Sequence, residues 1–372
     1  MRVLQVVTML SRDGAYGGPA RVALNQSAEL LGRGNDVTVV AATRDYPLGA
    51  GRIEDVPVRL FNARQLVPGS GFAGLGAPSM ARWVSRNRTR FDVVHIHFGR
   101  DLVVLPVAVT MRRSGIPYVL QTHGMVGPSD HPLAAPLDAA LTRKILRGAG
   151  AVFYLNAPER EQVGAVAGSA LPFVHLRNGV PTYRGTAARP GPPEVLFVAR
   201  MHPRKRPVAF VEMAKALLEK GVDARFTLVG PDEGEGPAIR AALGGGDTRL
   251  SWEGALAPVA VPQRMAAAGL YVLPSVREPF PMSVLEAMSV GLPVVITDDC
   301  GLASVVERTG SGIVTDPAVP ALAAAVESLL TDHELARAMG ERGRAVAHAD
   351  FGMQTVAERL QDVYSSLLGS SP

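Results

Sequence analysis

The chain has 372 residues, which is long enough for two domains. Its mean hydropathy of +0.15, with 47% hydrophobic and 19% charged residues, excludes a wholly disordered protein. The net charge of +4 is uneven, because residues 1–180 hold 20 Lys and Arg against 12 Asp and Glu, whereas residues 181–372 hold 18 against 22. The basic first half fits an anionic partner or membrane surface, and it fits ordinary solvated arginines equally well.

Three further observations favour a cytoplasmic protein. The single cysteine, Cys300, excludes an intramolecular disulfide framework and is typical of a reducing compartment. No apolar run reaches the roughly 18 residues of a membrane span. The apolar run within residues 1–10 is too short for a signal peptide and leads into a loop.

Short apolar strands alternate with helical stretches through the first half of the chain. Strands are expected at 2–9, 36–42, 56–61, 92–97, 117–122, 151–156 and 172–177. Helices are expected between most of them, for example at 19–33, 101–114 and 133–147.

The second half repeats this alternation. Strands are expected at 194–200, 224–230, 249–254, 270–274, 293–297 and 312–316. Strands that are rich in Val, Ile and Leu throughout are typical of parallel sheets covered on both faces, and strand–helix alternation predicts doubly wound units. We therefore predict an α/β protein with two Rossmann-like domains, at 1–180 and 194–352, facing across a cleft.

The segment at 181–193 has the Pro, Gly and small residues of a linker. Open parallel sheets bind ligands at the carboxyl ends of their strands, so two such edges predict a ligand site between the domains. The last segment, 353–372, contains an amphipathic helix with Val356, Leu360, Val363 and Leu367 on one stripe. It would either close the second domain or cross back to the first.

Two glutamates stand eight residues apart in VREPFPMSVLEAMSVGLPVV, residues 276–295. The loop after strand 270–274 opens a helix near Met282, and Ser283 is a candidate N-cap. A helix N-terminus attracts anions, and the carboxylates of Glu278 and Glu286 beside it fit a hydroxyl-rich anion such as a nucleotide-sugar. Alternatively, Glu286 is a surface helix residue and Glu278 a loop charge, an interpretation that spacing alone favours.

Two cations follow the first strand of the second domain, in VARMHPRKRP at 198–207. Arg200 ends the strand, and Lys205 lies where the next helix begins. Cations at this edge of a sheet can neutralise a leaving diphosphate. A solvated basic turn explains the same residues equally well.

Two strand ends of the first domain carry further candidates. Gly17 and Gly18, in the loop at 13–23, would let backbone amides approach a phosphate or sugar, or would form a plain tight turn. His123 ends the strand at 117–122, a position where a lone histidine is more often structural. His95 and His97 point to the same side of strand 92–97 but have no third metal ligand.

Several motifs are absent. The loop at 13–23 matches neither the dinucleotide fingerprint nor the P-loop. There is no Asp-x-Asp motif, so a metal-bound diphosphate is not expected. Cys300 does not stand in a sequence motif typical of a catalytic nucleophile.

The motifs together resemble the retaining glycosyltransferases of family 4, which have the two-domain GT-B fold. The matches run along nearly the whole chain. They are GGPAR after the first strand, THG, NGV at 178–180, VAR with Lys205, LVGPDEG at 228–234, EPFPMSVLEAM and GLPVVITD.

This resemblance implies roles for the candidate residues. Arg200 and Lys205 would hold the donor diphosphate, Glu278 the donor sugar hydroxyls near the reacting carbon, and Glu286 the ribose. His123 would contact the donor sugar from the first domain. The other implied donor contacts are Gly17, Gly18, Phe280, Pro281, Met282, Ser283, Val284 and Gly230, with Leu250 and Trp252 framing the base.

The resemblance also implies a metal-independent enzyme that moves a hexose from a UDP-sugar or GDP-mannose to a glycan, a lipid-linked or a small-molecule acceptor. The leaving phosphate would deprotonate the acceptor on the same face. Pro281 stands where the family usually has glycine, and it removes one N–H donor. Cys300, in place of a second glycine, is expected to affect packing only.

Two alternatives remain open: another GT-B enzyme such as an epimerase, or a non-catalytic nucleotide-sugar-binding module. A separate hypothesis concerns MARWVSRNRTRF at 80–91, where Trp83 stands among four arginines. With Arg112 and Arg113 it would contact an anionic membrane, or it is a solvated helix face. Nucleic acid is not an expected partner, because no recognisable binding module accompanies the basic residues.

Overall fold

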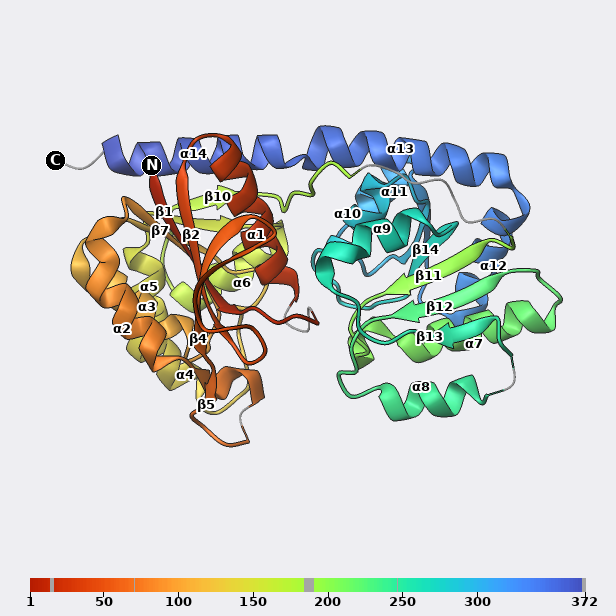
Figure 1. Ribbon diagram of the computed structural model, residues 1–372, viewed down its shortest axis with the longest axis horizontal. Helices are drawn as coiled ribbons and strands as arrows, with labels where there is room; N and C mark the ends of the chain where they lie inside the picture. Colours follow the sequence, from red (N-terminus) through yellow and green to blue (C-terminus); the bar gives the residue numbers. More distant parts are fainter. Residues whose placement is uncertain (14–16, 70, 184–190, 246, 370–372) are drawn as a thin grey trace. The chain divides into compact units, whose positions relative to one another are not determined.

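The computed structural model describes the chain except residues 14–16, 70, 184–190, 246 and 370–372 (Figure 1). Parts of the predicted loop at 13–23 and of the predicted linker at 181–193 therefore lie outside the described residues. The chain forms two compact units. Unit 1 comprises the described residues of 1–12, 16–179 and 353–372, and unit 2 those of 13–15 and 180–352.

Unit 1 contains an eight-stranded sheet with the strand order β10-β9-β8-β7-β1-β2-β4-β3. Its strands are β1 (Arg2–Met9), β2 (Asp36–Thr43), β3 (Gly49–Ile53), β4 (Val56–Asn62), β7 (Val93–His97), β8 (Tyr118–Gln121), β9 (Ala151–Tyr154) and β10 (Phe173–His175). A separate antiparallel pair joins β5 (Arg64–Gln65) to β6 (Leu75–Gly76). All neighbours in the large sheet are parallel except β3 and β4.

The antiparallel strand β3 was not among the predicted strands. Its hairpin turn is formed by Glu54 and Asp55, which both have positive φ angles, 48° and 64°. Two left-handed residues in succession make the turn that joins antiparallel strands most tightly, and Asn-Gly or Asp-Gly is its usual signal. Because Glu-Asp does not carry that signal, the hairpin was not predicted.

Helices cover both faces of this sheet (Figure 1). They are α1 (Gly17–Gly32), α2 (Pro78–Asn87), α3 (Val104–Ser114), α4 (Ala134–Leu137), α5 (Arg143–Gly148), α6 (Ala157–Ala167) and α14 (Met353–Gly369), with 3-10 turns at Gly71–Gly74 and Arg88–Arg90. The helix expected at 133–147 is divided by a π-helical turn, Asp138–Thr142. In that turn Asp138 forms a two-bond ion pair with Arg100, with both distances 2.8 Å.

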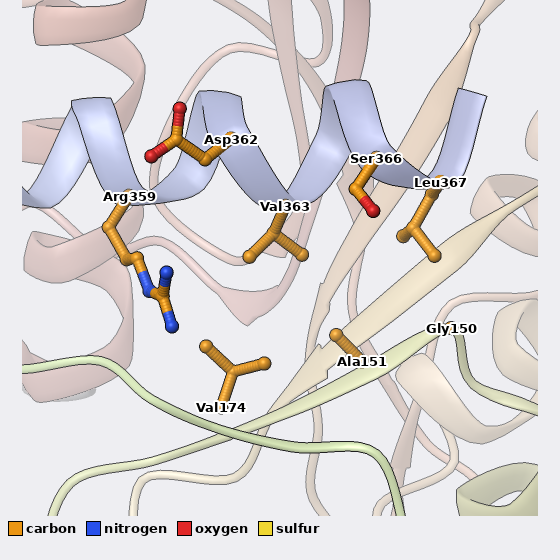
Figure 2. A pocket seen from close by; sticks show the side chains of 8 residues that line it. All are labelled: Gly150, Ala151, Val174, Arg359, Asp362, Val363, Ser366 and Leu367. Carbon is orange, nitrogen blue, oxygen red and sulfur yellow. The ribbon is translucent and has the colours of Figure 1, made fainter. Parts of the chain in front are cut away.

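The last helix, α14, packs on unit 1 beside α1. Val356 and Leu360 are buried in a cluster with sheet residues, and Tyr364 is fully buried. A cavity of about 250 Å³ lies under α14. Figure 2 shows Val363 and Leu367 pointing from this helix toward Val174 and Ala151. This cavity includes the amino end of β9, the opposite end of the strand from the expected ligand edge.

Unit 2 contains a six-stranded parallel sheet with the order β13-β12-β11-β14-β15-β16. Its strands are β11 (Glu194–Val198), β12 (Arg225–Val229), β13 (Leu250–Trp252), β14 (Leu270–Leu273), β15 (Val294–Thr297) and β16 (Gly312–Thr315). Its helices are α7 (Pro207–Glu219), α8 (Gly236–Leu243), α9 (Val261–Ala266), α10 (Met282–Ser289), α11 (Ala303–Thr309), α12 (Val319–Thr331) and α13 (His333–Phe351), with 3-10 turns at Pro203–Lys205 and Pro258–Ala260.

The predicted α/β architecture with parallel sheets is confirmed in both units. The central parallel strands, such as β1, β7, β11 and β14, are almost wholly buried, as near-continuous apolar sequences require, whereas β3 and β5 are largely exposed. Within the described parts of the chain, no helix is long and apolar enough to cross a membrane.

Candidate functional site

The carboxyl edge of the unit 2 sheet brings Lys205 and Glu278 into contact. Lys205 follows β11 on the turn Pro203–Lys205, and Glu278 lies in the loop between β14 and α10. The Lys205 Nζ ammonium donates a hydrogen bond to Glu278 Oε2, within an ion pair whose side chains are 12% and 6% exposed. The sequence placed both residues at this edge but did not predict that they pair.

Burial lowers the pKa of Lys205, and the nearby guanidinium groups of Arg204 and Arg200 act in the same direction. Glu278 opposes this shift, because a carboxylate in contact favours the ammonium form. The lysine is therefore a desolvated cation that depends on its partner, which is an arrangement suited to holding an anionic group.

Backbone contacts fix the Glu278 loop. The Glu278 N–H donates to the carbonyl of Asp299, and its own carbonyl accepts from the Gly301 N–H at 2.7 Å. A Cβ at Gly301 would lie 1.8 Å from the carbonyl oxygen of Pro279, so only glycine fits there. Cys300 is buried in the core beside them, and burial raises the pKa of its thiol to about 12, which makes it a packing residue rather than a nucleophile.

Arg200 is also paired. Its Nη1 lies 2.5 and 2.6 Å from the two carboxylate oxygens of Glu233. Both side chains are about one-third exposed, so a ligand can reach them. Sequence reasoning missed Glu233 as a site residue. The available signal was its place in LVGPDEG, in the loop that follows β12, whose carboxyl end lies beside that of β11.

Helix α10 starts at Met282, with Pro281 as its N-cap residue. The prediction that Ser283 caps this helix is wrong, because Ser283 lies inside the first turn and its hydroxyl forms a hydrogen bond with the Tyr271 hydroxyl, 2.8 Å away. The Pro281 carbonyl accepts from the Val284 N–H. Proline at the N-cap removes only its own N–H and leaves those of Met282 and Ser283 in place.

The side chains near this helix start differ in access. Phe280 packs on Phe351, with ring centroids 6.1 Å apart, and Val284 is fully buried, so Val284 could meet a ligand only through its backbone. Glu286 is 7% exposed inside α10. The alternative that Glu286 is a surface helix residue is therefore wrong, and Glu278 lies in a loop, as the other half of that alternative has it, but is buried.

A second group gathers at the carboxyl ends of β12 and β13. The Trp252 indole N–H donates to the Gly230 carbonyl at 3.0 Å, and the Gly230 N–H donates to the Gly254 carbonyl. Gly230 has φ +146°, and a Cβ there would lie 1.8 Å from the Ala199 carbonyl oxygen. Leu250 does not join this group, because it begins β13 and is buried in the core.

His123 lies in the loop that follows β8, at the carboxyl edge of the unit 1 sheet. Its backbone is left-handed, with φ 51°. Its Nε2 lies 2.7 Å from His97 Nδ1, and His97 Nε2 lies 2.8 Å from Gln5 Oε1. His95 instead binds the Tyr364 hydroxyl of α14. Burial lowers the pKa of His95 and of His123 to about 3, and that of His97 well below its ordinary value, so all three imidazoles are neutral at pH 7.

The remaining candidates are Gly17 and Gly18, which begin α1 directly after the undescribed residues 14–16. A Cβ at Gly18 would meet no atom within 4 Å, so steric crowding does not demand glycine there. Within the residues that the structure describes, no three or more His, Cys, Asp or Glu side chains are grouped to hold a metal ion.

Two family models together match most of the chain. Residues 183–346 match the model for "Glycosyl transferases group 1", and residues 17–179 match the "Glycosyl transferase 4-like domain". A D-inositol 3-phosphate glycosyltransferase 1 from Catenulispora acidiphila is 30% identical over 75% of this chain and 73% of its own length. The chain belongs to glycosyltransferase family 4.

Other relatives agree with this family assignment. An alpha-D-kanosaminyltransferase from Streptomyces kanamyceticus is 28% identical over 80% of this chain and 84% of its own length. HepE from Anabaena in complex with UDP-glucose has a TM-score of 0.75 at 19% identity, over 98% of this chain and all of its own. This family 4 glycosyltransferase thus has the GT-B fold, as the resemblance implied.

Proposed function

We propose that this family 4 glycosyltransferase moves a hexose from a nucleoside diphosphate sugar to an acceptor hydroxyl with retention of anomeric configuration. The observation that supports this proposal is the buried Lys205–Glu278 pair beside Arg200, at the edge where α10 begins. It combines cations for a diphosphate with a carboxylate that can accept hydrogen bonds from sugar hydroxyls.

Each charge in this group has a part in the proposal. The donor diphosphate replaces Glu233 as the partner of Arg200, which is accessible, and approaches Lys205. Glu278 accepts from donor sugar hydroxyls near the reacting carbon, and Glu286 accepts from the ribose. Gly230 and Trp252 lie beside the base, while Phe280, Met282 and the backbone of Ser283 and Val284 meet the sugar and phosphate.

The proposed chemistry breaks the bond between the anomeric carbon and the leaving phosphate oxygen. A bond from the acceptor oxygen forms on the same face, and the acceptor proton passes to the leaving phosphate. Arg200, Lys205 and the N-terminus of α10 stabilise the charge on that phosphate, so we propose that no metal is needed. His123 contacts the donor sugar.

The donor is a UDP-sugar or GDP-mannose in this proposal. HepE binds UDP-glucose, and a mycobacterial relative that is 26% identical is named GDP-mannose-dependent. The names of relatives include a 2-deoxystreptamine glucosyltransferase and a phosphatidylinositol monomannoside mannosyltransferase. The proposed acceptor class accordingly spans small molecules, lipid-linked sugars and glycans.

The proposal is tested by thermal shift with UDP-, GDP- and ADP-sugars, followed by an assay of slow donor hydrolysis in EDTA. We expect one nucleotide class to raise the melting temperature and its sugar to be released without added metal. Donor binding with no hydrolysis or transfer across a broad acceptor panel would favour a non-catalytic binding module. Conversion of the bound sugar to an epimer would favour the epimerase alternative.

We also propose a peripheral contact between α2 and anionic membrane. Arg82 and Arg86 are exposed on α2, and α3, which packs on α2, ends in the exposed Arg112 and Arg113. Trp83 packs between Phe61 and Phe91 under Arg59, so the arginines rather than the indole would supply the attraction. Co-sedimentation with liposomes should rise with anionic lipid and fall with salt, and binding that ignores lipid charge would contradict it.

A further inference from the structure

Three neighbouring strands of unit 1 build a hydrogen-bonded chain that ends at His123. Gln5 lies on β1, His97 on β7, and His123 two residues after the end of β8. Gln5 and His97 are fully buried, whereas His123 is partly exposed. The hydrogen-bonded chain therefore runs from the core of the sheet to His123, and of these three side chains only His123 is accessible to a substrate.

The donor and acceptor atoms in this hydrogen-bonded chain determine which ring nitrogen of His97 and of His123 carries a hydrogen. Gln5 Oε1 can only accept, so the His97 Nε2 that faces it carries a hydrogen. Because His97 is neutral, its Nδ1 then has a lone pair and accepts from His123 Nε2–H. Neutral His123 consequently has no hydrogen on Nδ1, and that atom has no hydrogen-bond partner among the described residues.

The direction of this hydrogen-bonded chain depends on the orientation of the Gln5 amide. Gln5 Oε1 lies 2.8 Å from His97 Nε2, whereas Gln5 Nε2 is buried and has no hydrogen-bond partner within the part of the protein that the structure describes. The opposite orientation would place an N–H donor against His97 Nε2 and would reverse both hydrogen bonds, so the tautomer of His123 reports which orientation the protein has.

A second residue fixes the backbone around His123. Glu159 Oε1 accepts from the Thr122 hydroxyl at 2.6 Å and from the Gly124 N–H at 2.5 Å, on either side of the histidine. Its Oε2 accepts from the Leu155 N–H at 2.7 Å. A left-handed conformation is unfavourable for histidine, and this buried carboxylate stabilises it by binding both neighbours.

We propose that His97 with Gln5, and Glu159, are positioning residues that hold His123 in a single tautomer, with Nδ1 offered as an acceptor to a sugar hydroxyl. This inference rests on the proposed function for its substrate. In this arrangement the sugar hydroxyl donates a hydrogen bond to His123 Nδ1. Fluorine cannot donate, so a donor sugar in which fluorine replaces that hydroxyl should bind more weakly. A merely structural histidine would show no such preference.

The tautomer is tested first without reference to activity. Long-range proton–nitrogen NMR spectra of the full chain with ¹⁵N-labelled histidine should show, at pH 7, a hydrogen on His123 Nε2 and a bare Nδ1. Assignment follows from the signals lost in His123→Gln. A His123 hydrogen on Nδ1, or fast exchange between both tautomers, would overturn the proposal whether or not the protein transfers sugar.

Two variants of His97 then connect the tautomer to the reaction. His97→Phe keeps an aromatic ring but removes the acceptor, so His123 should lose its fixed tautomer and kcat/KM should fall about tenfold. His97→Asn places an amide oxygen near the position of Nδ1, and it should restore both the Nε2–H signal and most of the lost activity. His175→Gln, at an exposed histidine of β10, is the matched control and should change neither.

The outcomes separate the inference from the proposed function. A wild-type protein with the expected tautomer but no transfer would contradict the function while leaving the hydrogen-bonded chain intact. An active wild-type enzyme whose His97→Phe variant keeps the tautomer and full kcat/KM would overturn the inference while leaving the function intact. Thermal melting of each variant, compared with His175→Gln, shows whether a loss comes from unfolding.

Discussion

Glu278→Gln is expected to lower the rate of transfer by about 10²–10³-fold, the usual cost of removing one electrostatic contact at a reacting centre. The same change leaves the buried ammonium of Lys205 without its counter-charge. Breaking such a pair costs about 3 kcal/mol, because an uncompensated charge remains in a desolvated place. The measurements are single-turnover transfer with saturating donor, and urea unfolding followed by tryptophan fluorescence.

The double variant Glu278→Gln/Lys205→Met separates stability from catalysis. It removes both charges, so most of the lost stability should return while transfer stays at the level of Glu278→Gln. Unit 2 contains one tryptophan, Trp252, and unit 1 contains Trp83, so a Trp83→Phe background reports the unfolding of unit 2 by itself. A Glu278→Gln enzyme with full activity would remove Glu278 from the proposed mechanism.

Unit 1 is expected to lose stability as the pH falls from 7 to 5. The folded pKa values of His95, His97 and His123 lie far below the value near 6.5 of an unfolded histidine. In this window the unfolded chain takes up protons that the folded unit does not, so the free energy of unfolding falls with the pH. The loss is about 2 kcal/mol for each histidine that stays neutral.

One buried carboxyl works against this loss. Burial raises the pKa of Asp101, so its protonation favours the folded state as the pH falls. Urea unfolding of unit 1, followed by Trp83 in a Trp252→Phe background, measures the net effect. His97→Asn should reduce the loss of unfolding free energy between pH 7 and 5 by about 2 kcal/mol, the contribution of one histidine. A free energy of unfolding that stays constant over this range would contradict neutral buried imidazoles.

The individual strands could be predicted because their side chains alone identify them. Continuous apolar runs such as Val294–Thr297 have few other stable environments than the interior of a parallel sheet. The hairpin of β3 was missed because its left-handed turn uses Glu54 and Asp55, whose conformation is imposed by the surroundings. Local propensity is weak where tertiary contacts decide the backbone.

The same contrast holds for the site. Arg200, Lys205, Glu278 and Glu286 were found because each stands in a recognisable motif near a strand end. Their partners were not, since Glu233 reaches Arg200 across a gap of 33 residues and Glu278 reaches Lys205 across 73. Ser283 was assigned as a cap from its residue type, but Tyr271 holds its hydroxyl instead.

The sequence by itself determined the class of fold, the places of most parallel strands along the chain, the family, and the residues that carry charge at the strand ends. These depend on periodicity and on motifs that are local in the chain. Only the tertiary structure decided that α14 packs on unit 1, that Glu278 and Glu286 are buried, and that Gln5, His97 and His123 form one chain of hydrogen bonds. Contacts between residues far apart in sequence leave no local pattern, because they arise only when the sheet brings neighbouring strands together.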